Sequence, residues 1–390
     1  MTEPLYYKDQ YIKDFTATVL EAEKKGDAYD IVLDKTAFFP ELGGQTADTG
    51  SIGESKVLHV REEGGRIIHK VDKALEVGQV VLCHVDFDER FEKMQSHTAE
   101  HLVCGIIHRE YGFDNVGFHL AECEVTFDVS GVLTEEMIAK VEDIANRAIY
   151  ENREITVSYP TPEEACALEY RSKLDITENL RIVTIDGYDD CACCAPHVSR
   201  TGEIGLIKIL DFMKHRGGTR IRLLAGRRAM QDYIRKHESA GKISSMLCVP
   251  KEDIATGVSD YMAAALVTEG RIKAANARIV ELEDSLVSHT EKNAVVFAKS
   301  ITVSDARELV NRMMKKVEGL SVVLLSTDGA YSYIMGSESV DVTLACREAN
   351  AALCGKGGGR PPMVQGSFSA TKEEIERYFL AEESSRTTEK

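Results

Sequence analysis

Short runs in which apolar and polar residues alternate cover the first part of the chain. Residues 15–20, 29–33 and 80–86 are rich in β-branched and aromatic side chains at a period of two, which is typical of strands buried on one face. Gly26 and the pair Gly64-Gly65 lie between such runs and indicate turns. Strands of this kind close readily into a small antiparallel barrel, so we expect an N-terminal β-barrel domain over residues 1–92.

The pattern changes to a mixture of helix and strand over residues 93–226. Apolar residues recur with the helical period from about Arg90 to Tyr111 and again from Thr134 to Glu151, where Thr134 can cap the helix. Strand-like runs occupy residues 116–120, 124–129, 202–209 and 219–224. Helices packed on an antiparallel sheet form an α+β domain, which is what we expect here.

The sequence pattern predicts helices over residues 227–293 and alternating strands and helices over residues 294–390. Within residues 227–293, apolar residues recur every seven positions, at Ala265, Ile272, Ile279 and Leu286, which predicts a helical hairpin or a coiled coil with a second copy of the chain. Packing inside one chain is the alternative, and we expect a homodimer through this segment and the C-terminal domain. Residues 294–390 place a helix between two continuous apolar runs, as in a small α/β domain. The fold class predicted for the whole chain is α+β multidomain.

Composition narrows the class of protein. A chain of 390 residues suits about two to four domains, and no apolar run is long enough to cross a bilayer. The N-terminus lacks the pattern of a secretion signal. We therefore expect a cytoplasmic protein with no membrane partner, in which the ten cysteines stay reduced. A net charge of −17 argues against non-specific nucleic-acid binding, so a nucleic acid would need local basic patches.

Two pairs of potential metal ligands stand far apart in the sequence. His97 and His101 lie four residues apart on an expected helix, and Cys193 and His197 repeat that spacing. Three imidazoles and one thiolate suit tetrahedral zinc, whereas an isolated HxxxH is more often a pair of ordinary packed or surface histidines. The cysteine-rich run also contains Cys191 and Cys194, and either thiol could replace Cys193 or help to hold a second metal.

Two glycine-rich runs are further candidates. Phe38–Gly50 reads FFPELGGQTADTG, and its adjacent glycines permit close approach of a ligand or simply form a tight turn. Gly355–Gly366 reads GKGGGRPPMVQG and offers backbone amides and two cations to a phosphate, unless it is a flexible loop.

The order of these motifs resembles a known family. FFPELGGQTADTG, then HTAEH, then CxxxH followed by TGEIG, is similar to the editing half of alanyl-tRNA synthetases and of their free-standing relatives, the alanyl-tRNA editing proteins. The run GKGGGRPPMVQG looks like the signature of the C-terminal DHHA1-type domain that these synthetases share with DHH phosphoesterases. Nothing precedes the first motif that could house an aminoacylation domain, so we expect the long free-standing form and not a ligase.

The resemblance implies roles for particular residues. One zinc ion per chain would be held by His97, His101, Cys193 and His197, although this family commonly has CGGTH where this chain has CCAPH. The residues implied to line the editing pocket, the bound aminoacyl group or the tRNA path are Gly43, Gly44, Gln45, Phe118, His119, Lys356, Gly357, Gly358, Gly359 and Arg360.

The implied activity is zinc-assisted hydrolysis of tRNA(Ala) mischarged with serine or glycine. A pocket shaped for alanine cannot strongly reject either amino acid, so a second hydrolytic site is needed. Glu100 is the first candidate for general base, with a contact behind the metal or a solvent-facing position as its alternative, and His119 is the second. Thr98 could meet the serine hydroxyl.

Two other classes of protein fit part of the sequence. HTAEH also matches HxxEH, the inverted zinc-metallopeptidase motif, which needs a downstream carboxylate such as Glu178 but leaves the cysteine cluster unexplained. A non-catalytic tRNA-binding protein is the other alternative.

Overall fold

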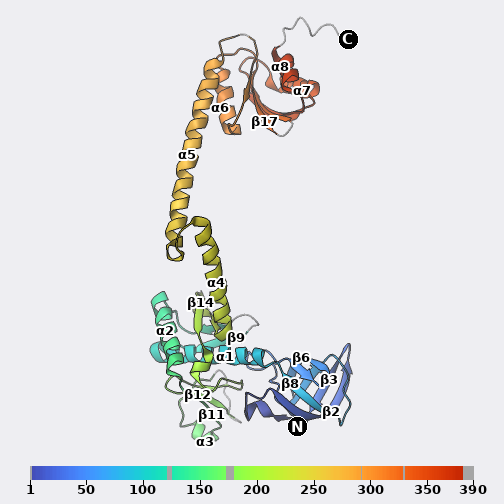
Figure 1. The fold of residues 1–390 in the computed structure, drawn as a ribbon, viewed down its shortest axis with the longest axis vertical. Helices are drawn as coiled ribbons and strands as arrows, with labels where there is room; N and C mark the ends of the chain where they lie inside the picture. Colours follow the sequence, from blue (N-terminus) through green and yellow to red (C-terminus); the bar gives the residue numbers. More distant parts are fainter. Residues whose placement is uncertain (1, 121–124, 173–179, 291, 328–329, 381–390) are drawn as a thin grey trace. The chain divides into compact units, whose positions relative to one another are not determined.

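The computed structural model describes residues 2–120, 125–172, 180–290, 292–327 and 330–380. The chain forms two compact units, Met1–Gly241 and Lys242–Lys390, and each combines helices with sheets (Figure 1). The mixed α+β class expected from the sequence is therefore confirmed. Over the described residues, none of the helices has the length and apolar character needed to span a membrane.

The first strands of the chain close into a six-stranded barrel. The order of strands around it is β2 (Asp14–Lys25), β3 (Ala28–Leu33), β7 (Arg66–Val71), β6 (Ser55–Glu63), β5 (Gly50–Ile52) and β8 (Val80–Val85). Buried and exposed residues alternate along β8 and the first half of β2, as the sequence pattern predicts. The glycine-rich run beginning at Phe38 connects β4 (Lys35–Thr36) with β5, and its Phe38 and Phe39 fill the barrel core.

A histidine is enclosed in this barrel. His69 is fully buried, its Nε2 lies 2.8 Å from the hydroxyl of Thr36, and its Nδ1 lies 3.2 Å from the carbonyl oxygen of Ile31. A neutral ring satisfies both contacts, with Nδ1–H donating to the carbonyl and Nε2 accepting from the hydroxyl. Burial therefore lowers the pKa of His69 from 6.5 to about 4.

This pKa shift predicts acid sensitivity. Above pH 6.5 the ring is neutral in both the folded and the unfolded chain, so the shift has no effect. As the pH falls from 6.5 towards 4, the unfolded chain binds a proton that the folded chain does not, and the free energy of unfolding should drop by about 3 kcal/mol. The variant His69→Gln should lose this part of the pH dependence, whereas His59→Gln, on an exposed part of β6, should retain it. Urea unfolding followed by circular dichroism between pH 7 and pH 4 measures the difference; equal slopes for wild type and His69→Gln would contradict it.

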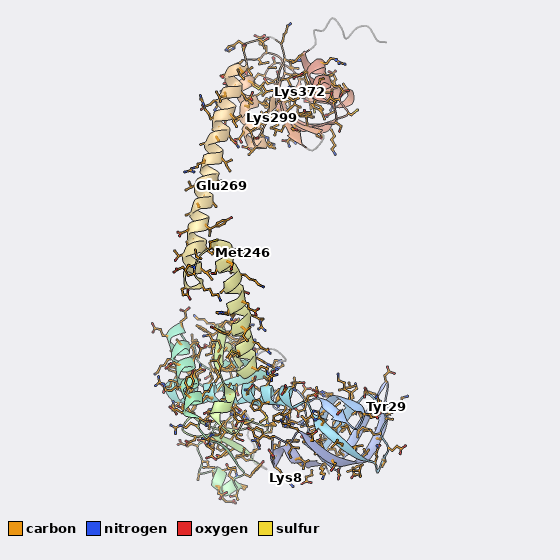
Figure 2. The ribbon with its side chains drawn as sticks, viewed as in Figure 1. Lys8, Tyr29, Met246, Glu269, Lys299 and Lys372 are labelled. Atoms are coloured by element: carbon orange, nitrogen blue, oxygen red, sulfur yellow. The ribbon has the colours of Figure 1, made fainter. Side chains whose placement is uncertain are left out.

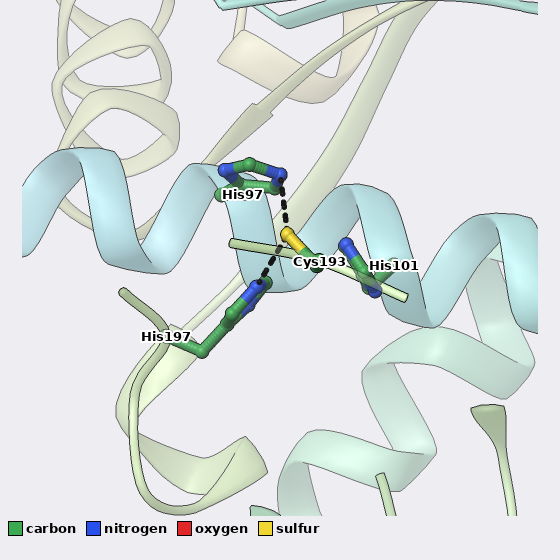
Figure 3. A group of neighbouring side chains, drawn as sticks. All are labelled: His97, His101, Cys193 and His197. Atoms are coloured by element: carbon green, nitrogen blue, oxygen red, sulfur yellow. Dashed lines mark hydrogen bonds between the residues drawn. The ribbon is translucent and has the colours of Figure 1, made fainter. Parts of the chain in front are cut away.

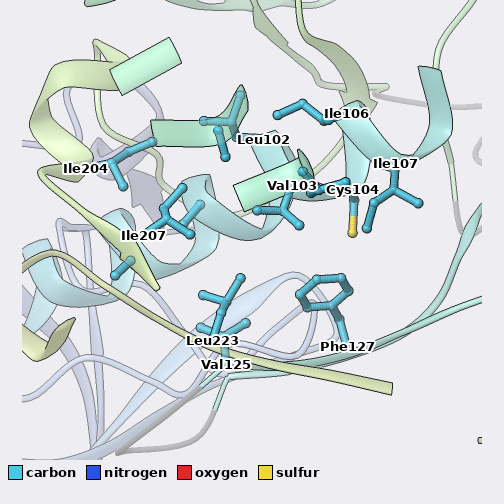
Figure 4. Packing of buried hydrophobic residues seen from close by; sticks show 14 of the residues in the cluster. Leu102, Val103, Cys104, Ile106, Ile107, Val125, Phe127, Ile204, Ile207 and Leu223 are labelled. Atoms are coloured by element: carbon cyan, nitrogen blue, oxygen red, sulfur yellow. The ribbon is translucent and has the colours of Figure 1, made fainter. Parts of the chain in front are cut away.

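The second part of unit 1 is built around one long helix. α1 (Phe87–Tyr111) contacts α2 (Glu135–Glu151), and Thr134 caps α2 as predicted, its side chain accepting from the Met137 amide. Figure 4 shows the shared core, in which Leu102 and Ile106 of α1 lie among residues from several strands. Those strands form an antiparallel sheet in the order β14 (Ile207–His215), β15 (Gly218–Ala225), β10 (Val125–Val129) and β9 (Asn115–Leu120).

One predicted strand in this region is partly wrong. The sequence pattern places a strand over residues 202–209, but Thr201–Ile204 form a 3-10 turn and β14 begins at Ile207. Gly205 between them has a φ of +81°, a conformation open to glycine that breaks the strand. A second, smaller sheet follows the order β11 (Ile155–Ser158), β12 (Ile182–Ile185) and β13 (Asp189–Ala192), and the cysteine cluster begins at the end of β13.

The helical segment and the C-terminal domain follow. The helices α4 (Gly226–Leu247) and α5 (Ile254–Leu286) confirm the helical prediction for this segment. In unit 2 a sheet takes the order β16 (Ala294–Ala298), β17 (Ser321–Thr327), β18 (Ala330–Gly336), β20 (Met363–Phe368) and β19 (Lys356–Arg360). β16 and β17 are parallel and joined through α6 (Val303–Met313), which is the α/β connection expected from the two apolar runs. Unit 2 also contains the helices α7 (Val342–Ala352) and α8 (Lys372–Leu380).

Candidate metal centre

The two distant ligand pairs meet in unit 1. α1 carries His97 and His101 one turn apart, and the segment after β13 carries Cys193 and His197 to the same place (Figure 3). One potential ligand atom from each of the four side chains lies within 4.8 Å of the other three. The Sγ of Cys193 is 3.6 Å from Nε2 of His97 and 3.4 Å from Nε2 of His197. Three imidazoles and one thiolate thus converge in a geometry that suits a tetrahedral metal ion.

The other nitrogen of each imidazole has a polar neighbour, and for His97 and His197 this contact is a hydrogen bond. Nδ1 of His97 lies 2.9 Å from the Gln45 side-chain oxygen, Nδ1 of His101 lies 3.3 Å from a carboxylate oxygen of Asp189, and Nδ1 of His197 lies 3.1 Å from the Thr98 hydroxyl. Thr98 donates its own proton to the Met94 carbonyl, so it accepts from His197. Partners that hold Nδ1–H leave Nε2 as the ligand atom and are a regular feature of histidine metal sites. The imidazoles of His97 and His197 are therefore held in an orientation that suits metal binding, whereas Nδ1 of His101 faces the Asp189 carboxylate without a hydrogen bond among the described residues.

The pKa values of His197 and His101 also favour a bound metal ion. Burial lowers the pKa of His197 to about 3, which keeps its ring neutral. Burial also lowers the pKa of His101, but Cys191, Cys193 and Asp189 outweigh burial and raise that pKa well above its usual value. The surroundings of His101 are thus built for a positive charge, which a metal ion supplies in place of the proton.

Neighbouring thiols differ in their suitability as ligands. Burial raises the pKa of Cys193, but the three imidazoles, His97 foremost, outweigh burial and hold that pKa well below its usual range. Burial raises the pKa of Cys194 to about 11, and this side chain packs against the barrel core near Gly43. A thiolate is the form that binds metal, so Cys193 is the better candidate. Cys191 lies on the other side of His101, in a second buried group with Asp189.

A carboxylate lies beside the cluster. Glu100 is buried on α1, and one of its oxygens accepts from the Asn115 side-chain amide and, at 3.3 Å, from the Cys104 thiol. Its second oxygen lies 3.9 Å from Nε2 of His101, the nitrogen that faces the other ligands. Glu100 therefore points towards the candidate metal position. Because its side chain is buried, the solvent-facing alternative from the sequence does not hold.

The first glycine motif forms a wall of the same site. The Phe118 ring on β9 lies 4.6 Å from the His97 ring, and a side-chain carbon at Gly44 would approach Phe118 to 2.8 Å. Gly44 has a φ of +84° as well, so both its conformation and its surroundings require glycine. Gln45 is fully buried, and its side-chain nitrogen has no hydrogen-bond partner among the described residues.

Other predicted site residues are placed differently. Thr98 is fully buried and its hydroxyl is engaged by Met94 and His197, so its position supports the ligand His197 and not a substrate contact. His119 is exposed and follows Phe118 on the strand, so it projects from the opposite face. The glycine-rich run Lys356–Arg360 belongs to unit 2, and Glu178 lies outside the described residues.

Sequence reasoning missed the residues that support the ligands. Asp189 and Arg171 form a buried ion pair with two contacts of 2.6 Å and 2.7 Å behind His101, and Asn115 orients Glu100. Asp189 lies four residues before Cys193, so its proximity to the motif was a usable signal. Arg171 and Asn115 carry no comparable signal.

A small pocket opens at the cluster. It has a volume of about 140 Å³ and is lined by His97, Glu100 and His101 from α1, by Gly43, by Arg171 and Ser172, and by residues 191–194. The pocket therefore gives a small molecule access to the ligand cluster and to Glu100.

Comparison with known proteins finds sequence similarity in the region of Cys193 and His197 and in the N-terminal part of the chain. The family described as "Threonyl and Alanyl tRNA synthetase second additional domain" matches residues 180–223, which include Cys193 and His197. The family described as "tRNA synthetases class II (A)" matches residues 3–89. The alanyl-tRNA editing protein AlaX-L of Pyrococcus horikoshii is 28% identical over 397 residues, covering 96% of each chain. Over nearly its whole length, this chain is similar in sequence to alanyl-tRNA editing proteins.

Two further relatives give the extent of the match. The alanyl-tRNA editing protein Aarsd1 of Mus musculus is 27% identical over 411 residues, covering 97% of each chain. Alanine–tRNA ligase of Ignicoccus hospitalis is 30% identical over 376 residues, which are 92% of this chain but 40% of the ligase. The chain thus corresponds to the length of the editing proteins and spans less than half of the ligase.

Proposed function

We propose that this protein is an aminoacyl-tRNA hydrolase that deacylates tRNA(Ala) mischarged with serine and, by the same reaction, with glycine. The relationship to proteins named alanyl-tRNA editing proteins supports the substrate. The observation that carries the proposal is the convergence of three imidazoles and Cys193 beside the buried carboxylate of Glu100. The pocket of about 140 Å³ suits a small amino acid.

We propose that His97, His101, Cys193 and His197 hold one zinc ion. Nitrogen and sulfur donors of this kind favour zinc among the common divalent ions. With all four side chains bound, zinc would have no open coordination position, so it would stabilise charge on the ester carbonyl oxygen through its field, or directly once one ligand is displaced. Among the chain's own groups, Glu100 accepts a proton from the attacking water as the new carbon–oxygen bond forms, and the ribose oxygen leaves and takes up a proton. Asn115 keeps Glu100 in place for this transfer by donating to its other oxygen.

Release of serine from seryl-tRNA(Ala) tests this function. The wild-type chain should release serine faster than the uncatalysed ester and should leave alanyl-tRNA(Ala) largely intact. The variant Glu100→Gln should bind zinc normally but lose about 10² to 10⁴ in kcat, the range for removal of a general base. Glu110→Gln, on the same helix but with an exposed ion pair to Lys140, should behave as the wild type. Full activity in Glu100→Gln would remove Glu100 from the mechanism, and inactivity of the wild type would refute the function.

The metallopeptidase alternative has less support. It uses only the HxxEH residues and a downstream carboxylate, and leaves the contacts of Cys193 with His97 and His197 without a role. In the release assay, a metallopeptidase would leave seryl-tRNA(Ala) uncleaved and hydrolyse peptides.

We propose that the second glycine-rich run binds tRNA. The run forms the hairpin of β19 and β20 instead of a flexible loop. A side-chain carbon at Gly357 would lie 2.5 Å from the Tyr333 hydroxyl, so packing requires that glycine, and Gly359 is also in close contact with β20. Gly358 has open space around it, and Lys356 and Arg360 flank it on the same face of the strand. Its bare backbone between two cations suits close approach of a phosphate.

Substitutions of these glycines should separate binding from folding. Gly358→Leu should leave the thermal midpoint of the chain nearly unchanged and weaken tRNA binding about fivefold or more, the loss of one contact of about 1 kcal/mol. Gly357→Ala should lower the thermal midpoint because of its clash with Tyr333. Filter binding at fixed salt and thermal unfolding measure the two effects. If Gly358→Leu binds tRNA as tightly as the wild type, this face of the hairpin is not the contact.

We also propose a homodimer and a cytoplasmic location. Ile272 and Leu286 of the predicted seam in α5 are exposed by 56% and 79%, and Figure 2 labels Glu269 on the same helix. Exposed apolar residues at heptad spacing favour pairing with a second helix.

The described cysteines are free thiols, as expected in a reducing compartment. Sedimentation velocity and cell fractionation test the two proposals.

A further inference from the structure

A larger cavity adjoins the metal pocket. It has a volume of about 810 Å³ and lies between the end of α1, residues 168–172 and residues 187–191. Arg171, Ser172 and Cys191 line both this cavity and the small pocket. The two spaces therefore share a wall, and a molecule held in the larger one can extend a small group to the ligand cluster.

The sizes of the two spaces match two parts of one molecule. The pocket of about 140 Å³ beside Glu100 has room for a small aminoacyl group but not for a purine nucleoside as well. An aminoacyl ester joins these two parts through a single bond to the ribose. When the ester carbonyl is at the metal pocket, the nucleoside must lie immediately next to that pocket.

The lining of the larger cavity selects against phosphate. Both of its guanidinium groups are already engaged: Arg171 pairs with Asp189, and Arg109 donates to the Gly187 carbonyl at 2.7 Å. Asp114, Glu169 and Asp190 also line the cavity. Asp114 lies 2.9 Å from Nδ1 of His108, and the negative charge of Glu169 and Asp190 repels a phosphate group. Carboxylates accept hydrogen bonds from hydroxyl and amino groups, so the lining suits a neutral, hydroxyl-bearing ligand.

Aromatic surface is present as well. Tyr170 and Tyr188 line the cavity, and the guanidinium of Arg109 lies 5.2 Å from the centre of the Tyr188 ring. Aromatic rings and guanidinium planes are the surfaces on which nucleic-acid bases stack. Aromatic rings together with hydrogen-bond acceptors are the combination that a nucleoside requires.

We propose that this cavity binds the 3′-terminal nucleoside of the charged tRNA, with its base against Tyr170 or Tyr188 and its ribose at the wall formed by Arg171, Ser172 and Cys191. The inference rests on the proposed function, because it assigns a place to the part of the substrate next to the scissile ester. The terminal nucleoside is thus a recognition element of its own, separate from the aminoacyl group and from the body of the tRNA.

Three serine esters test the inference: seryl-tRNA(Ala), the 3′-seryl ester of adenosine, and serine ethyl ester. The wild-type chain should cleave seryl-adenosine with a kcat/KM at least about fivefold above that of the ethyl ester, the lower limit of what stacking of one base contributes. The variant Leu168→Trp places a bulky side chain at a half-exposed position that lines only the larger cavity. It should remove this advantage through KM, with the ethyl ester cleaved as by the wild type, whereas Leu168→Ala should keep the advantage.

The outcomes separate the two proposals. If wild-type protein releases no serine from seryl-tRNA(Ala), the proposed function fails. If it cleaves seryl-tRNA(Ala) but treats seryl-adenosine and the ethyl ester alike, the nucleoside site is refuted while the function stands. Equal losses on all three esters in Leu168→Trp, at unchanged zinc content and circular dichroism, would also refute the nucleoside site.

Discussion

Cys193→Ala is expected to lose bound zinc and to reduce serine release from seryl-tRNA(Ala) to the uncatalysed rate. Cys193 is the thiolate on which His97 and His197 converge, and its removal leaves three neutral donors with no anionic ligand. Loss of a residue that only supports a ligand already lowers metal affinity about 10- to 100-fold, so loss of the ligand itself should cost more. Metal analysis after dialysis, beside the release assay, measures both effects.

The neighbouring thiol provides the control for this prediction. Cys194→Ala changes the same number of atoms one residue away, but the Cys194 side chain packs against the barrel core and has a raised pKa. It should retain zinc and activity. The reverse result, with zinc kept in Cys193→Ala and lost in Cys194→Ala, would assign the ligand to Cys194 and overturn the arrangement drawn here.

Asp48→Ala should destabilise unit 1 by about 3 to 5 kcal/mol, the cost of leaving a buried charge without its partner. Arg90 and Asp48 are each 1% exposed, and Nε of Arg90 donates to both carboxylate oxygens, at 2.8 Å and 2.9 Å. Arg90 also donates to the Ala37 carbonyl, and Asp48 accepts from the Phe39 amide. The pair therefore ties the first glycine-rich segment, on one wall of the metal pocket, to the helix that carries two of the ligands.

Two further variants show how much of the loss in unfolding free energy comes from the unpaired buried charge. The double variant Asp48→Leu with Arg90→Met removes both charges together and should recover much of the lost stability, because an apolar pair of similar size replaces a buried ion pair at little cost. Asp143→Ala breaks an exposed pair with Arg147 on α2 and should hardly change the unfolding free energy. Urea unfolding followed by circular dichroism suits a chain without tryptophan. A double variant as unstable as Asp48→Ala would show that packing and not charge is responsible.

The structure bears on two questions that the sequence leaves open, namely the form of the second glycine-rich run and the presence of a basic patch. A flexible loop is one interpretation of the glycine-rich run near the C-terminus, but Gly357 and Gly359 fit closely against Tyr333 and β20, and the run forms a hairpin. A nucleic acid would need local basic patches, yet Arg220 and Arg222 of β15 pair with Asp128 and Asp211. Such neutralisation depends on acids from other segments, which charge along the sequence does not reveal.

The sequence by itself determined the local elements and the four candidate ligands. The barrel strands, α1, α2 and the parallel pair β16 and β17 follow from short-range periodicity, because burial of one face imposes a period on neighbouring residues. The ligand pairs were recognisable because each pair has a fixed spacing of four residues.

Only the tertiary structure decided how those ligands are held. Which nitrogen of each histidine faces the candidate metal position depends on Gln45, Thr98 and Asp189, and all three lie about fifty residues or more from the histidine that they contact. The preference for Cys193 over Cys194 as the proposed ligand, the outward position of His119 and the cavity beside the candidate metal pocket also come from the tertiary structure. These features depend on contacts between side chains that folding brings together from distant segments, and such contacts leave no period in the sequence.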